Sequence, residues 1–259
     1  MMIATSALAE GHYAQINGLN LYYEIHGQSH TNQPPLVLLH GGGSTIETTF
    51  GHTLPLLAKS RQVIAYEQQG HGHTNDIADR PFTFEQSADD AAALMQHLGI
   101  EKADFFGYSN GGSIAMQIAI RHPKLVRKLI IASAMYKRDG LPPEFWEGMR
   151  HASLDNMPKE LRDAYVAVAP HPDQLQSFHD KSVQRMLTFK DWPDDALRNI
   201  QSPSLIIIGD ADVIRPEHAI AMYRLIPHAQ LAILPMTDHM KFVERATWLV
   251  EMVEEFLDR

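Results

Sequence analysis

The chain of 259 residues contains no cysteine. Disulfide bonds, thiolate metal sites and a cysteine nucleophile are therefore excluded, and the absence agrees with a reducing compartment. Basic residues are also scarce, because 22 Lys and Arg stand against 31 Asp and Glu, for a net charge of −9. A surface of this sign repels nucleic acid and anionic membranes, so we expect neither as a partner.

Long apolar runs are absent as well. The run at residues 205–208 is typical of the longest, far short of the ~20 residues that span a bilayer. The first nine residues are mildly apolar, but they lack a basic segment and are too short for a signal peptide. We therefore expect a cytoplasmic protein that acts on a small molecule, and the sequence leaves its oligomeric state open.

The apolar residues that are present alternate between two periodicities. Residues 15–25 predict an antiparallel hairpin that turns at Asn17 and Gly18. Short apolar runs predict strands buried on both faces at 36–39, 62–66, 103–106, 128–132, 204–208 and 231–234. A spacing of 3.6 residues predicts helices at 84–98, 113–121, 217–225 and 242–257. This alternation predicts an α/β fold with a doubly wound, mostly parallel sheet.

One segment, residues 135–193, interrupts the alternation because it contains no run that resembles a strand. It is divided by prolines and contains about a third of the aromatic residues. We interpret it as a helical cap inserted into a core made of residues 1–134 and 194–259. Apolar side chains of such a cap line a pocket beneath it, and Trp146 is our candidate for a substrate-binding residue there.

The sequence G-Y-S-N-G at residues 107–111 places Ser109 between a predicted strand and a predicted helix. A turn this tight needs residues without bulky Cβ groups on both sides, and the glycines meet that need. The turn projects the Ser109 hydroxyl beyond the carboxyl end of the sheet, where open α/β sheets bind ligands. A serine that only caps the helix is the alternative.

A serine nucleophile also needs hydrogen-bond donors for the oxyanion. The sequence H-G-G-G at residues 40–43 follows a predicted strand, and its glycines expose backbone N–H groups. Gly42 and Asn110 are our candidate donors. Gly43 is a second candidate on the first loop, and Gly43 and Tyr108 are also candidate substrate-binding residues. A plain glycine-rich loop is the alternative.

A base must accept the serine proton, and His239 follows the strand predicted at 231–234. A loop at that edge of the sheet can reach Ser109. His71 and His73 could bind a metal ion, although no further ligand pattern accompanies them, and a packed loop is the favoured interpretation. His40 is expected to brace the glycine loop.

A carboxylate must orient the base, and the sequence G-D-A-D at residues 209–212 follows the strand predicted at 204–208. Asp210 and Asp212 both lie at the same edge of the sheet as Ser109 and His239. We favour Asp212 as the acid because it lies further along the loop. Asp238 is adjacent to His239, so its side chain is expected to point elsewhere.

Together these segments resemble the α/β-hydrolase fold family, in which the order along the chain is serine, acid, histidine. The resemblance covers nearly the whole chain and implies Ser109 as nucleophile, Asp212 as acid and His239 as base. Two positions depart from the family pattern: Met236 replaces a common glycine, and residues 67–69 (Glu-Gln-Gln) replace Asp-x-Arg. Neither departure removes a catalytic group, and Glu67 is expected to be a structural hydrogen-bonding residue.

The resemblance implies a serine hydrolase that cleaves a carboxylic ester or a related acyl bond, as an esterase or lactonase does. It implies no metal and no organic cofactor. Ser109 argues against the epoxide hydrolases and haloalkane dehalogenases of the family, which use aspartate. Amide hydrolysis, perhydrolysis, C–C bond hydrolysis, a cofactor-free lyase and a small-molecule sensor remain open, because they differ in the pocket rather than in the motif.

Overall fold

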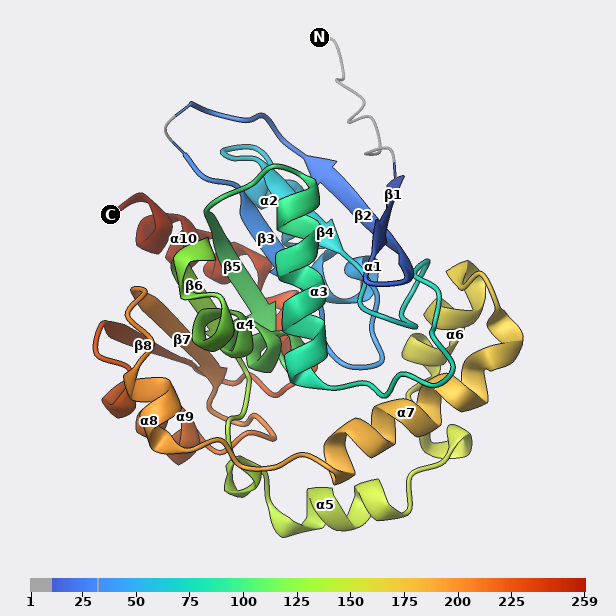
Figure 1. Cartoon of the computed structure of the whole chain (residues 1–259). Coiled ribbons are helices and arrows are strands. Elements are labelled where there is room, and N and C mark those ends of the chain that lie inside the picture. Colours follow the sequence, from blue (N-terminus) through green and yellow to red (C-terminus); the bar gives the residue numbers. More distant parts are fainter. Residues whose placement is uncertain (1–10, 32) are drawn as a thin grey trace, which may run out of the picture.

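Figure 1 shows the computed structural model of the protein, which describes residues 11–31 and 33–259. Eight strands form one sheet in the order β1-β2-β4-β3-β5-β6-β7-β8. β1 and β2 pair antiparallel with each other, β2 also pairs antiparallel with β4, and the remaining neighbours are parallel. The strands are β1 (Gly11–Ile16), β2 (Leu19–His26), β3 (Leu36–Leu39), β4 (Val63–Tyr66), β5 (Ala103–Tyr108), β6 (Val126–Ala132), β7 (Ser204–Gly209) and β8 (Ala229–Leu234).

Strands are present at all six predicted positions, and the predicted hairpin is β1–β2. The prediction of burial on both faces is wrong for β8, because β8 is an edge strand and Ile233 is 42% exposed. Asn17 and Gly18 both have positive φ at its turn, as a tight two-residue hairpin requires. The expectations about the first nine residues lie outside the described residues. Within the described ranges, no helix is long and apolar enough to cross a membrane.

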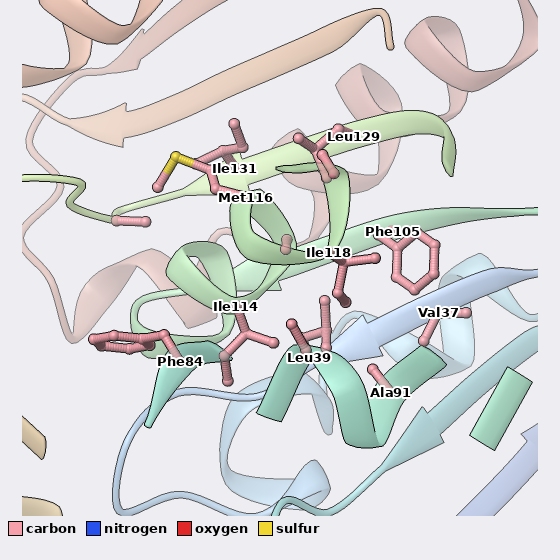
Figure 2. Close-up of a cluster of buried hydrophobic side chains, with 14 of the residues drawn as sticks. Val37, Leu39, Phe84, Ala91, Phe105, Ile114, Met116, Ile118, Leu129 and Ile131 are labelled. Carbon is pink, nitrogen blue, oxygen red and sulfur yellow. The ribbon is translucent and has the colours of Figure 1, made fainter. Parts of the chain in front are cut away.

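Alternate residues of the central strands face two separate apolar clusters, as a doubly wound sheet requires. On one face, Val37 and Leu39 of β3 pack with α3 (Phe84–His97) and α4 (Asn110–Arg121), and this cluster is drawn in Figure 2. On the other face, Leu36 and Leu38 pack in a second cluster. The helices of the second cluster are α1 (Ile46–Phe50), α2 (Leu54–Leu57) and α10 (Ala246–Asp258). The predicted fold class is confirmed.

Two more helices flank the last strands: α9 (Pro216–Leu225) packs on β7 and β8, and α8 (Asp194–Arg198) packs on α9 and α4. Between β6 and β7 the chain forms α5 (Pro143–Arg150), α6 (Lys159–Val168) and α7 (Leu175–Leu187) and no strand. Figure 1 shows these three helices, which we call the inserted helices, grouped beyond the end of the sheet to which β5 points.

The observed helices differ from the sequence prediction in two short helices and at two helix starts. The short helices α1 and α2 were not predicted, because four or five residues are too few to display a helical period. α4 begins at Asn110 rather than at residue 113, and the prediction started later because Gly111 and Gly112 have no side chains that could display a helical period. α10 begins at Ala246 rather than at residue 242, because residues 241–244 form a separate 3₁₀ turn.

The turn between β5 and α4 brings backbone segments into direct contact. A Cβ atom on Gly111 would overlap the carbonyl oxygen of Leu39, and a Cβ atom on Gly107 would overlap the carbonyl oxygen of Gly111. Both obstacles are backbone atoms, which cannot rotate away as a flexible side chain could. The two glycines therefore allow the turn to lie against β3.

We predict that Gly111→Ala lowers the free energy of unfolding by about 2–3 kcal/mol, because the new methyl group must displace backbone. Gly148→Ala is the control, because nothing lies within 4 Å of its new methyl group and it occupies a helix interior. The control is expected to be neutral or to stabilise by about 0.5–1 kcal/mol. Urea denaturation measures both, and equal stability of the two variants would contradict this reading of the turn.

Candidate active site

Ser109 connects β5 to α4 with a left-handed backbone, at φ 55° and ψ −122°. Such a conformation is costly for a residue with a Cβ, and it persists only where the surroundings impose it. Here the Ser109 N–H donates to the carbonyl of Ala132 at 2.8 Å, which holds the turn against β6. The Ser109 side chain consequently lines a cavity beneath the inserted helices.

Ser109, His239 and Asp212 are brought together from three loops that follow β5, β8 and β7. The Ser109 Oγ lies 3.0 Å from His239 Nε2, and His239 Nδ1 lies 2.8 Å from Asp212 Oδ1. The Asp212 side chain is fully buried, whereas that of His239 is 23% exposed. Burial raises the pKa of Asp212, but hydrogen bonding and electrostatic attraction to His239, with a further hydrogen bond from the Ile214 N–H, outweigh burial and leave this pKa below its ordinary value.

An ionised Asp212 accepts only, so the proton of a neutral His239 resides on Nδ1. The Nε2 atom is then the acceptor that faces the Ser109 hydroxyl. This is the tautomer that a general base for Ser109 requires.

Asp210 and Asp238, the other two carboxylates near His239, do not contact its ring. Asp210 accepts the N–H groups of Met236 and Thr237, each at 3.0 Å, and so holds the loop that precedes His239. Asp238 accepts the N–H of Lys241 at 2.8 Å on the far side of the loop.

Met236 occupies the position where the family commonly has glycine. Its backbone has positive φ, which explains the glycine preference, and its side chain is 74% exposed, so that methionine causes no clash there.

The glycine loop after β3 has three N–H groups with different partners. Gly41 donates to Thr49 Oγ1 and Gly43 donates to His71 Nε2, both at 3.3 Å. Gly42 donates to no acceptor among the described residues. The Asn110 N–H is also free of an intrahelical partner, because Asn110 is the first residue of α4. Gly42 and Asn110 both line the cavity beside Ser109.

His40 lies behind this loop with a fixed tautomer. The Gln68 N–H donates to its Nε2 at 3.1 Å, so Nδ1 carries the proton and donates to the Gly41 carbonyl at 2.8 Å. Burial lowers the pKa of His40 to about 4, which keeps the ring neutral. The Gly41 carbonyl belongs to the same peptide unit as the Gly42 N–H, so His40 orients that donor.

His71 and His73 have separate hydrogen-bond partners. His71 accepts from Gly43 through Nε2 and donates from Nδ1 to the Gln69 carbonyl at 2.8 Å. The ring of His73 pairs with Glu67 at 2.9 Å, and Glu67 also accepts the N–H of Ile46. In the ranges that the structure describes, no group of three potential ligands could hold a metal ion.

Arg185 of α7 supports the glycine loop, and the sequence analysis did not identify it. Its side chain is buried, and Nη1 donates to Gln68 Oε1 at 3.0 Å. The Gln68 Nε2 in turn donates to the His40 carbonyl at 2.8 Å. An inserted helix is thereby tied to the glycine loop. Only the helical spacing of Arg185 from Lys181 could have indicated a shared face toward the core.

The cavity has a volume of about 350 Å³ and reaches from Ser109 to the inserted helices. Of the three predicted substrate-binding residues, Gly43 lines the cavity, whereas Trp146 and Tyr108 do not. Trp146 faces away and donates from Nε1 to the Arg138 carbonyl at 2.9 Å, while its neighbour Phe145 lines the cavity.

Tyr108, like Trp146, has contacts outside the cavity. The Tyr108 hydroxyl donates to the carbonyl of His239, and its ring stacks on Phe242, so it supports the loop of the base. Adjacent residues on a helix face about 100° apart, which the sequence alone could not resolve for Phe145 and Trp146.

A family model described as "alpha/beta hydrolase fold" matches residues 34–193. The chain therefore belongs to the alpha/beta hydrolase fold family, as the resemblance implied.

Individual relatives cover most of the chain. The 2-hydroxymuconate semialdehyde hydrolase of Pseudomonas sp. (strain CF600) is 29% identical over 244 residues, covering 86% of this chain and 86% of that protein. A proline iminopeptidase of Lactobacillus helveticus is 26% identical over 281 residues, covering 93% of this chain and 95% of that protein. The crystal structure of the enol-lactonase from Burkholderia xenovorans LB400 has a TM-score of 0.77 at 25% identity, covering 95% of this chain and all of the other. All three of these proteins are named as hydrolytic enzymes, but their names state different substrates.

The buried neutral histidines predict how stability depends on pH. Burial lowers the pKa of His40 and of His218 to about 4, and it lowers that of His71 well below the ordinary value. The unfolded chain binds these protons near pH 6.5, whereas the folded chain does not. Above pH 6.5 these histidines therefore leave the free energy of unfolding unchanged with pH. As pH falls from 6.5 toward 4, the free energy of unfolding decreases by about 1.4 kcal/mol per pH unit for each histidine.

Urea denaturation between pH 7.5 and pH 5 measures this decline. His218 accepts the Tyr136 N–H through Nε2 at 3.2 Å, which a glutamine oxygen can replace. We expect His218→Gln to reduce the slope of stability against pH by about one proton. A stability that does not change over this interval would contradict the assignment of neutral rings.

Proposed function

We propose that the protein hydrolyses a carboxylic ester or a lactone, with Ser109 as nucleophile, His239 as general base and Asp212 as the acid that orients it. The observation that supports this most strongly is the pair of short contacts from Asp212 through His239 to Ser109, at the wall of an apolar cavity. The substrate is a small molecule, in keeping with the cavity volume of about 350 Å³.

The reaction begins when His239 Nε2 removes the Ser109 proton as Oγ attacks the substrate carbonyl. The carbonyl oxygen of the substrate becomes an oxyanion, which accepts hydrogen bonds from the Gly42 and Asn110 N–H groups. The amino end of α4 favours the same negative charge, because its unpaired N–H groups point toward it. Asp212 stabilises the imidazolium of His239 during this step.

Collapse of the tetrahedral intermediate transfers the proton from His239 to the leaving alcohol oxygen and leaves an acyl group on Ser109. Water then enters, gives a proton to His239 and attacks the acyl carbon through the same oxyanion geometry. The second collapse releases the carboxylic acid and returns the proton to Ser109. In a lactone the alcohol and the acid are parts of one product.

We also propose that residues 135–193 act as a cap on the core of residues 1–134 and 194–259. Side chains of all three inserted helices line the cavity opposite Ser109. An apolar cover of this kind limits the access of bulk water and strengthens the electrostatic interactions beneath it.

C–C bond hydrolysis is a second candidate, because the relative from Pseudomonas is named for 2-hydroxymuconate semialdehyde. A muconate bears a carboxylate, and no Lys or Arg side chain lines this cavity. Ester or lactone hydrolysis is therefore the function that the geometry supports better.

We predict that Ser109→Ala lowers kcat for a p-nitrophenyl ester by about 10⁶ relative to the wild type, because the nucleophile is lost. Ser87→Ala, a buried serine of α3, is the control and should keep wild-type turnover. Both variants are expected to unfold near the wild-type temperature. Turnover retained by a folded Ser109→Ala protein would exclude Ser109 as nucleophile, and ligand binding without any turnover would indicate a sensor.

The two neighbouring carboxylates provide a matched test of the acid. Asp212→Asn should lower kcat by about 10⁴, because an amide does not impose the required tautomer on His239. Asp210→Asn should cost less than about tenfold, since Asp210 contacts only backbone N–H groups of the loop. Steady-state kinetics on one ester would measure both. A larger loss in Asp210→Asn would reverse the assignment.

A further inference from the structure

Charged side chains are excluded from the walls of the cavity, although the inserted segment is rich in them. Residues 135–193 contain eight Lys or Arg and nine Asp or Glu. None of these seventeen residues lines the cavity, and neither does any other charged residue among the described ranges. The histidines 179 and 239 are the titratable side chains on its walls.

α7 shows how this exclusion is built. Phe178, Ser182 and Met186 recur every four residues and line the cavity. The cations of the same helix lie on another face, where Lys181 pairs with Asp76 at 2.6 Å and Arg185 is held by Gln68. The helix therefore carries two positive charges near the site and directs both of them away from it.

The same separation holds for the other two inserted helices. On α5, Phe145 and Met149 line the cavity, whereas Arg150 pairs with Glu147 outside it. On α6, Leu161 lines the cavity, whereas Lys159 pairs with Asp163 at the surface. Every inserted helix thus presents apolar residues to the cavity and charges to its own neighbours.

Most polar groups on the far walls already have partners. Ser113 donates to the Met135 carbonyl at 2.7 Å and Ser182 donates to the Phe178 carbonyl at 2.8 Å. The amide oxygen of Asn156 accepts the Ser153 N–H, and its nitrogen donates to the His151 carbonyl.

Two polar side chains on the walls keep an atom without a partner among the described residues: the Ser133 hydroxyl, which is neutral, and one ring nitrogen of His179. The Nδ1 of His179 pairs with Asp180 at 3.1 Å, and its Nε2 has no hydrogen bond among the described residues. The free ring nitrogen can hydrogen-bond a polar group of a substrate, and no Lys or Arg side chain lines the cavity beside it.

We infer that this site takes uncharged acyl compounds, esters or lactones with a compact apolar acyl group, and rejects those whose acyl group carries a carboxylate. This inference rests on the proposed function. An ionised group that enters such a cavity loses its hydration and gains no countercharge. The flexible side chains of Met135, Met149, Met157 and Met186 line the walls and suit apolar groups of more than one shape.

Two esters that differ only in charge test the inference. p-Nitrophenyl 5-methylhexanoate ends in an isopropyl group, and mono-p-nitrophenyl glutarate ends in a carboxylate of similar shape. At pH 8 we expect kcat/KM of the wild type to be at least about 100-fold higher for the neutral ester, since desolvation of the carboxylate is uncompensated.

A matched pair of variants then supplies the missing charge. Leu161 lies beside Gly43, at 3.5 Å from the position of a Gly43 Cβ. Leu161→Lys should lower the ratio of kcat/KM between the neutral and anionic esters at least tenfold. Leu161→Gln, which is polar and uncharged, should leave that ratio near the wild-type value. The ratio within one variant cancels any loss of folded protein.

The outcomes separate the two proposals. Equal kcat/KM for both esters in the wild type, with Ser109→Ala inactive, overturns this inference and leaves the proposed function standing. An equal fall of the ratio in Leu161→Lys and Leu161→Gln overturns it as well, because polarity rather than charge would then discriminate. If the wild type hydrolyses neither ester and a fluorophosphonate does not label Ser109, both proposals fail.

Discussion

The left-handed backbone of Ser109 is the constraint on which the site depends. It requires Gly107 and Gly111 on either side, because a Cβ at either position would overlap a backbone carbonyl. This turn also packs directly against the end of β3, because the carbonyl groups of Leu39 and His40 lie beside Gly111. Through this arrangement the packing of the central sheet fixes the Ser109 hydroxyl at 3.0 Å from His239 Nε2, although the two residues are 130 positions apart in the sequence.

The glycine loop is restrained from several directions, and these restraints leave one N–H free. Thr49 and His71 accept from the N–H groups of Gly41 and Gly43, so that of Gly42 is the one without a partner on this loop, as the proposed oxyanion site requires. His40 holds the carbonyl of the same peptide unit, and Arg185 reaches the loop through Gln68. Buried neutral histidines suit this task because each donates from one nitrogen and accepts at the other.

The sequence predicted most of the sheet because its strands are buried on both faces and read as continuous apolar runs. It predicted Ser109, Asp212 and His239 as neighbours because parallel strands deliver their following loops to one edge. The sequence could not show whether Phe145 or Trp146 lines the cavity, because the orientation of a helix about its axis depends on what packs against it. Arg185 escaped notice for the same reason: its contact with Gln68 joins residues 117 positions apart.

Labelling with a fluorophosphonate tests the central claim most directly, because the reagent reacts with a serine whose hydroxyl is activated and requires no knowledge of the substrate. After proteolysis, mass spectrometry identifies the labelled peptide. The account predicts one label per chain, on Ser109, and its loss when the protein is denatured beforehand. A native protein that stays unlabelled, or that is labelled on another serine, would contradict the account.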